Sequence, residues 1–266
     1  MTTTSTKERM PVLFIGHGSP MNAIEDNAWS RGFDTLGNAL PTPSAILAVS
    51  AHWYVTGTLL TSNDRPETIH DFGGFPRALF EVQYPARGST DLAGQVVDLL
   101  ASRKARLSDE WGLDHGTWSV LTHLRPEADV PVVQLSIDRR LAPADHLAIG
   151  RALAPLRDQG IMIMASGNVT HNLGHAMRSM QTGDTTRPAW AARFDREIET
   201  ALEQHDFDQL TRSITTDHGR LSHPSPDHYL PLLYAAGAAN DNDAVSFPVN
   251  GWDLGSLSMR SVQFGA

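Results

Sequence analysis

The chain has 266 residues, a formal net charge of -9 and no cysteine. The missing thiols exclude disulfides, thiolate catalysis and cysteine-ligated zinc or iron–sulfur sites, so any metal must be bound by nitrogen or oxygen ligands. The acidic charge, with no basic stripe, argues against nucleic acid as a partner. Hydrophobic residues at 41% and charged residues at 19% are typical of a globular protein.

The first ten residues are polar and lack the apolar stretch of a signal peptide. We predict a flexible segment over 1–10 and one catalytic domain over 11–266, because no linker or charge block divides the remainder. No apolar run approaches the ~18 residues that span a bilayer. We therefore expect a cytoplasmic enzyme without a membrane partner. The sequence carries no signal for an oligomeric state.

Short, continuous apolar runs predict buried strands over 11–15, 44–50, 131–136 and 160–166. Strands that are apolar on both faces are typical of a parallel sheet covered on both sides. The runs at 244–249 and 257–264 predict two closing strands, and Pro248 indicates a sheet edge for the first of them.

Helical patterns lie between these runs. They begin after Ser89, around Ile149 with an end or kink at Pro155, and at Pro188, which suits a first helical turn. The alternation predicts a single-domain α/β fold with a mostly parallel central sheet and helices on both faces.

Five histidines lie in short sequence segments, here called frames, at or near the ends of predicted strands or in turns: His17, His52, His115, His171 and His228. In α/β sheets, ligands bind beyond the carboxyl ends of the strands, where side chains from several strands meet. Neutral imidazole is the commonest metal ligand and moves protons near neutral pH. The pattern therefore indicates a metal site or an acid/base site.

Each frame also has a plain structural interpretation. His17 suits a turn bonded to local backbone, and His52 suits a buried core histidine. Asp114 either pairs with His115 or caps a helix, and Asp227 suits a helix start. The loop 68–76, with two phenylalanines around a glycine pair, is either an aromatic lid over a planar substrate or an ordinary turn. We expect solvated or capping roles for the remaining histidines: His123, His146, His175, His205, His218 and His223.

Taken together, the frames resemble the 4,5-DOPA extradiol dioxygenase family, the single-chain branch of the class III extradiol ring-cleaving dioxygenases. The similarity runs from Pro11 nearly to Phe264. The segments that carry it are Gly16–Met21, Ser50–Trp53, His70–Pro76, Trp111–Gly116, Ala165–Asn168 with His171-Asn172, Pro226–Tyr229 and Gly255–Met259.

The resemblance implies an extradiol aromatic ring-opening dioxygenase with a mononuclear metal held by His17, His52 and His228. Fe(II) is expected for activity, and Zn(II) is an alternative occupant. More distant relatives use a glutamate as third ligand, so Asp227 remains an alternative to His228. The substrates would be O2 and a small-molecule catechol such as DOPA.

The resemblance also implies roles for the surrounding side chains. His171 is expected to act as the catalytic acid/base, and additional ligation of the metal by this residue stays open. His115 is expected to hydrogen-bond substrate or oxygen. In the glycine-containing loop, His70, Phe72 and Phe75 are expected to bind substrate.

Three other functions fit parts of the pattern. A zinc-dependent hydrolase would use three histidines and a bound water. A chelatase-like tetrapyrrole enzyme shares a Gly-His-Gly-Ser turn after its first strand but gives no role to His52, His115 or His228. A non-catalytic metal-binding relative would not need His171 or His115 as acid/base partners.

Overall fold

The computed structural model describes residues 9–265. Its main sheet has eight strands in the order β4-β3-β5-β2-β6-β1-β10-β7, and β8 and β9 form a separate two-stranded sheet. The strands are β1 (Val12–Gly16), β2 (Ala45–Val55), β3 (Leu59–Thr61), β4 (Arg106–Ser108), β5 (Val132–Asp138), β6 (Ile161–Gly167), β7 (Val245–Ser246), β8 (Trp252–Asp253), β9 (Leu257–Ser258) and β10 (Val262–Phe264).

The central four strands, β5-β2-β6-β1, are all parallel, whereas β10 and β7 are antiparallel additions at one end. The helices are α1 (Ala28–Ala39), α2 (Arg77–Phe80), α3 (Thr90–Leu99), α4 (His115–Leu124), α5 (Pro143–Leu153), α6 (Leu173–Thr182), α7 (Ala189–Glu203), α8 (Phe207–Ser213), α9 (Asp217–Ser222) and α10 (Leu230–Ala238). Short 3-10 turns cover Pro20–Ala23, Ala101–Arg103 and Ala154–Gln159.

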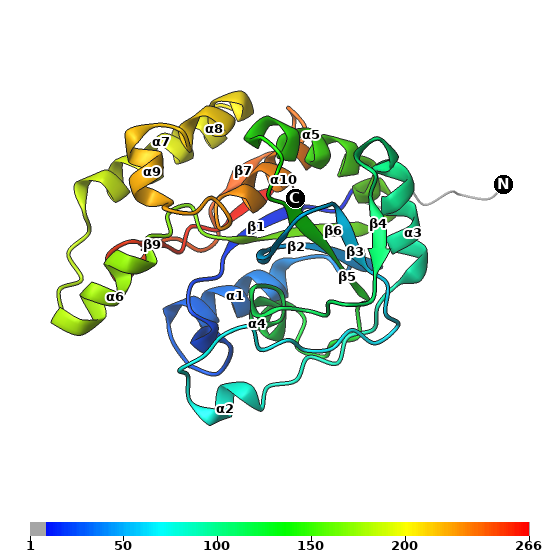
Figure 1. Ribbon diagram of the computed structural model, residues 1–266, viewed down its shortest axis with the longest axis horizontal. Helices are drawn as coiled ribbons and strands as arrows, with labels where there is room; N and C mark the ends of the chain where they lie inside the picture. Colours follow the sequence, from blue (N-terminus) through cyan, green and yellow to red (C-terminus); the bar gives the residue numbers. More distant parts are fainter. Residues whose placement is uncertain (1–8, 266) are drawn as a thin grey trace.

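Helices cover both faces of the sheet (Figure 1). Val12 and Phe14 belong to the core shared with α3, α5, α7, α8 and α10, whereas the alternate residues Leu13 and Ile15 belong to the core shared with α1 and α4. This alternation follows from the two-residue period of a strand. The predicted single-domain α/β fold with a mostly parallel sheet is confirmed.

The central strands β1, β2, β5 and β6 follow the predicted apolar runs closely. Ser89 caps α3, as its place before the helical pattern indicates, by accepting a hydrogen bond from the Leu92 N–H. Two details differ from the prediction. β2 continues to Val55 through a register irregularity between Val49 and Tyr54, so His52 lies inside a bulged strand rather than beyond its end. The run 257–264 forms two strands in different sheets, β9 and β10. β7, the strand beside Pro248, lies at the sheet edge as predicted.

The predicted flexible segment 1–10 lies mostly outside the described residues. Within them, Met10 is buried, and its N–H donates to the Arg157 carbonyl while the Arg157 guanidinium donates to the Met10 carbonyl. Among residues 9–265, no helix combines the length and apolarity that crossing a membrane requires.

Candidate metal centre

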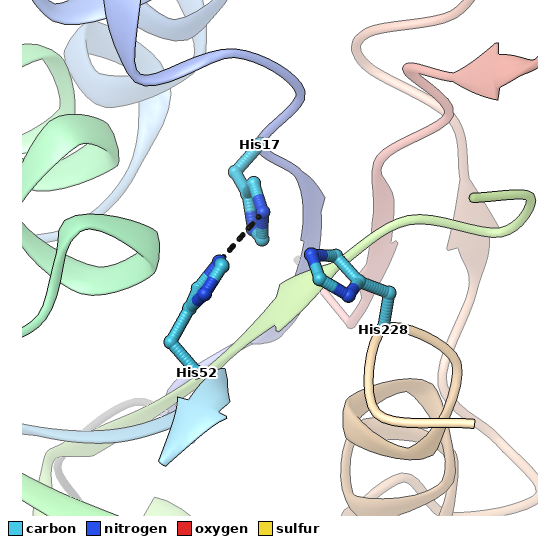
Figure 2. A group of neighbouring side chains, drawn as sticks. All are labelled: His17, His52 and His228. Atoms are coloured by element: carbon cyan, nitrogen blue, oxygen red, sulfur yellow. Dashed lines mark hydrogen bonds between the residues drawn. The ribbon is translucent and has the colours of Figure 1, made fainter. Parts of the chain in front are cut away.

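Three histidines converge at the carboxyl ends of the central strands (Figure 2). His17 follows β1 directly, His52 comes from β2, and His228 precedes α10. The register aligns Gly16 with Gly167 and Ser50 with Ser166, which brings the ends of β1, β2 and β6 together. One ring nitrogen of each histidine lies within 4.8 Å of the others, and Nε2 of His17 is 3.3 Å from Nε2 of His52.

Close backbone packing holds this cluster in place. Gly18 has φ +63°, a left-handed conformation that glycine adopts without a Cβ penalty, and it turns the chain away after His17. A Cβ on Gly167 would lie 2.2 Å from the carbonyl oxygen of His228. That carbonyl instead accepts a hydrogen bond from the Asn168 N–H at 2.9 Å. Glycine at the end of β6 therefore lets the His228 segment lie against the sheet.

Neighbouring groups fix the tautomer of His17. Its Nδ1 lies 2.9 Å from Oγ of Ser166, and that hydroxyl donates its proton to the Gly116 carbonyl. A hydroxyl has one proton to donate, so Ser166 accepts from Nδ1–H of His17. The lone pair of His17 is therefore on Nε2, the nitrogen that faces the other two rings.

Carboxylates lie against Nδ1 of the other two rings. Nδ1 of His228 is hydrogen-bonded to Asp227, and Nδ1 of His52 lies 3.4 Å from Oδ2 of Asp71. A carboxylate only accepts, so Nδ1 of His228 carries the proton and the Nε2 lone pair of His228 is free. The 3.4 Å contact with Asp71 favours the same tautomer for His52. Such outer hydrogen bonds are typical of metal-binding histidines.

Burial keeps these imidazoles uncharged. Loss of hydration lowers the pKa of His17 and of His228 well below 6.5, and the neighbouring imidazoles lower both further. The same two causes lower the pKa of His52 to about 3, although Asp71 opposes the shift. Three neutral imidazoles with lone pairs turned toward one another are a donor set that suits Fe(II) or Zn(II).

His171 and His115 complete the cluster. The ring of His171 stacks on the ring of His228, with centroids 3.5 Å apart and an angle of 2° between the planes. Burial is the main cause that lowers the pKa of His171, to about 4. His115, the first residue of α4, has its ring 3.8 Å from that of His52, centroid to centroid. The structure thus gathers all five predicted histidines.

The acidic partner of His115 is not its chain neighbour. Asp114 caps α4 by accepting a hydrogen bond from the Thr117 N–H, and it also accepts from the Gln134 side chain. Of the two roles considered for Asp114, the structure therefore shows the helix cap. Burial, together with the nearby charge of Asp71, raises the pKa of Asp114 to about 6. His115 bonds instead to Asp71, 2.9 Å from its Nδ1. The sequence analysis assigned Asp71 no role, although it lies between His70 and Phe72.

The aromatic loop reaches the cluster through Phe72. Its ring meets the His115 ring edge to face at 5.4 Å, and Phe75 packs behind it at 5.3 Å. His70 is turned away, because its Nε2 lies 3.0 Å from the carbonyl oxygen of Val82, to which it donates. Its ring packs against Trp118.

The expectation of a solvated or capping role is wrong for His146. His146 is fully buried, with Nδ1 2.9 Å from the hydroxyl of Tyr234, and His223 is buried with Nε2 2.8 Å from the Val169 carbonyl oxygen. Neither side chain is solvated, but His223 is the C-cap residue of α9, where its backbone N–H donates to the Gly219 carbonyl, so its expected capping role is confirmed. Asp227 does not start a helix: α10 begins at Leu230 without a side-chain cap, and Asp227 bonds to His228.

Comparison with known proteins agrees with this arrangement. Residues 11–262 match the family described as the catalytic LigB subunit of aromatic ring-opening dioxygenase. The chain is 49% identical to a 4,5-DOPA dioxygenase extradiol of Escherichia coli K12, over 97% of this chain and 95% of that protein. It is 39% identical to the protein of the same name from Beta vulgaris, over 94% and 95% of the two chains.

A solved structure shares the fold as well. The crystal structure of an uncharacterized protein from Escherichia coli K12 superposes with a TM-score of 0.83 at 45% identity, covering 97% of this chain and all of the other. Family match, identity and fold extend over nearly the whole length. The chain belongs to the LigB family and is an aromatic ring-opening dioxygenase.

Proposed function

We propose that this chain opens a catechol ring outside the diol, with both atoms of O2 entering the product, at one Fe(II) held by Nε2 of His17, His52 and His228. The observation that carries the proposal is the convergence of one ring nitrogen from each of the three histidines, with Nδ1 of His17 and of His228 hydrogen-bonded and Nδ1 of His52 lying 3.4 Å from Asp71. Zn(II) suits the same donors and would compete for them. The catalytic domain is proposed to span 11–266.

A bound Fe(II) would supply positive charge for the catechol oxygens and open positions for the diol and O2. His171 lies against the ring of a ligand, so it is placed beside a substrate bound there. We assign it the removal of a proton from a catechol hydroxyl and the later return of that proton. His115, whose Nδ1–H is donated to Asp71, presents Nε2 as an acceptor for a substrate hydroxyl.

The aromatic loop is assigned the remaining substrate contacts. Phe72 supplies an apolar ring next to His115, and Phe75 and His70 support Phe72 from behind. A planar catechol is expected to pack against Phe72. Packing against Phe72 would favour a planar aromatic substrate without distinguishing one catechol from another.

DOPA is the proposed first substrate to test, because relatives from Escherichia coli, Beta vulgaris and Portulaca grandiflora share the name 4,5-DOPA dioxygenase extradiol. The product would be a semialdehyde that forms a yellow, ring-opened chromophore. The family membership argues against the hydrolase, the chelatase-like enzyme and the non-catalytic relative.

The test is anaerobic reconstitution of metal-free protein with one equivalent of Fe(II), followed by L-DOPA or simple catechols in aerated buffer. We expect one O2 consumed per substrate and a yellow product whose mass equals substrate plus both oxygen atoms, or, for L-DOPA, that mass less one water once the amine has condensed with the new aldehyde. Zinc-loaded protein is the matched control and should be inactive. Quinone formation without ring opening, or no O2 uptake with any catechol at full iron loading, would overturn the proposal.

A further inference from the structure

One carboxylate outside the set of three metal-binding histidines touches two of the five clustered rings. Oδ1 of Asp71 lies 2.9 Å from Nδ1 of His115, and Oδ2 lies 3.4 Å from Nδ1 of His52. The Asp71 side chain is 15% exposed, so little water competes for these contacts. The two oxygens therefore serve different imidazoles, one a proposed metal ligand and the other a proposed substrate contact.

The same side chain anchors the aromatic loop. Oδ1 also accepts a hydrogen bond from the backbone N–H of His115, the first residue of α4, at 2.9 Å. The positive end of a helix favours a carboxylate at this place. Since Phe72 follows Asp71 in the chain and lies against the His115 ring, this bond also determines where Phe72 stands.

We infer that Asp71 is a positioning residue that holds His52 and His115 together in the Nδ1–H tautomer, so that one ring binds the metal and the other receives the substrate. This inference rests on the proposed function of both histidines. Its chemical core is the placement of the acceptors: the two Nδ1 atoms lie against different oxygens of one carboxylate, so both oxygens must be able to accept. An amide at this place supplies only one.

A second metal site made of His52, Asp71 and His115 is the competing interpretation of the cluster, because their ligand atoms also lie within 4.8 Å of one another. Two hydrogens already occupy Oδ1 of Asp71, from Nδ1 and from the backbone N–H of His115. A cation placed there would face both of these donors. The hydrogen-bonded arrangement therefore favours one metal per chain.

The decisive variant is Asp71→Asn, which keeps the shape of the side chain but turns an NH2 group toward one of the two rings. That ring loses its acceptor and is pushed to the tautomer with the proton on Nε2, so that Nε2 can no longer bind a metal or accept from a substrate. The matched control is Asp34→Asn, because Asp34 bonds Nδ1 of His123 at 2.8 Å in a carboxylate–histidine pair that includes none of the clustered ligand atoms.

The measurements are zinc affinity by chelator competition, zinc stoichiometry, and the long-range proton–nitrogen NMR spectrum of the histidine rings in zinc-loaded protein. We expect Asp71→Asn to weaken zinc binding by about 10- to 100-fold and to change the tautomer of His52 or His115. Asp34→Asn should leave both unchanged. Neither readout depends on turnover, so failure of ring cleavage in the wild type would count against the proposed function alone.

The inference is overturned if Asp71→Asn binds zinc within twofold of wild type with both rings in the wild-type tautomer, or if wild type binds two zinc ions. Wild-type protein alone also decides the question should the variant not fold. An Nε2–H signal for His115 in the zinc-loaded wild type would contradict the assignment without any substitution.

Discussion

The rings of His171 and His228 lie parallel and in contact, with centroids 3.5 Å apart. His171 is held there by its N–H, which donates to the Ser222 carbonyl, and by a bridge to Leu257. The stacking places the imidazole of His171 beside the proposed ligand His228. His171 itself does not belong to the group of converging ligand atoms. Proton transfer next to the metal, rather than metal binding, is the role that this relationship supports.

Replacing His171 by Ala should separate these two roles. We expect kcat for ring cleavage to fall by about 10²- to 10⁴-fold, the range that positioned acid/base groups contribute. Iron content should stay at one per chain. Metal analysis and O2 uptake are measured on the same sample, with His175→Ala as a nearby control. Unchanged kcat would remove the acid/base assignment, and loss of iron would make His171 a ligand.

Ser166 should influence metal binding without touching the metal. In Ser166→Ala, His17 loses the acceptor for Nδ1–H, and we expect iron or zinc affinity to fall by about tenfold. Ser136→Ala is the matched control, because Ser136 is equally buried and its hydroxyl also donates to a backbone carbonyl, that of Gly57. Equal affinities in the two variants would mean that Ser166 does not orient His17.

The third ligand is tested by two neighbouring substitutions. His228→Ala should abolish stoichiometric metal binding, because it removes a lone pair from the converging set. Asp227→Asn should keep the metal at reduced affinity, since Asp227 contacts Nδ1 of His228. Metal content by elemental analysis distinguishes them. Loss of metal only in the Asp227 variant would assign the ligand to the carboxylate instead.

The buried His146 should make stability depend on pH. Burial lowers its folded-state pKa to about 4, against about 6.5 in the unfolded chain. Between these values the unfolded chain binds more protons, so the free energy of unfolding decreases as pH falls. From pH 7 to pH 5, this group should remove about 2 kcal/mol.

Urea unfolding of metal-free wild type and His146→Leu across this pH range measures that contribution. The wild type should lose about 2 kcal/mol more than the variant on going from pH 7 to pH 5. Working without metal removes the effect of ligand protonation from the comparison. Parallel stability profiles for the two proteins would show that His146 does not contribute.

The apolar runs and the histidine frames predicted the sheet and the gathering of five rings, because continuous hydrophobicity indicates strands buried on both faces and the carboxyl ends of parallel strands lie at one edge. The run 257–264 was less informative. Its hydrophobicity predicts one strand, but the chain leaves the two-stranded sheet after Ser258 and joins the main sheet at Val262. Tertiary packing, and not local sequence, determines this break.

The hydrogen bonds that orient the rings could not be predicted from local sequence. Asp71 and His115 are 44 residues apart, and His17 and Ser166 are 149 apart. Asp114, adjacent to His115, offered a nearer carboxylate and took the capping role instead. Choosing between two acidic partners requires the loop to be placed on α4, which only the three-dimensional structure provides.

The measurement that tests the central claim most directly is a crystal structure of the iron- or zinc-loaded protein with anomalous data at the metal edge. The account predicts one ion bound by Nε2 of His17, His52 and His228, at about 2.0–2.1 Å for zinc. Asp71 and Asp227 should each contact an Nδ1 atom and not the ion. An ion bound by Asp71, or ligated by Asp227 in place of His228, would contradict it.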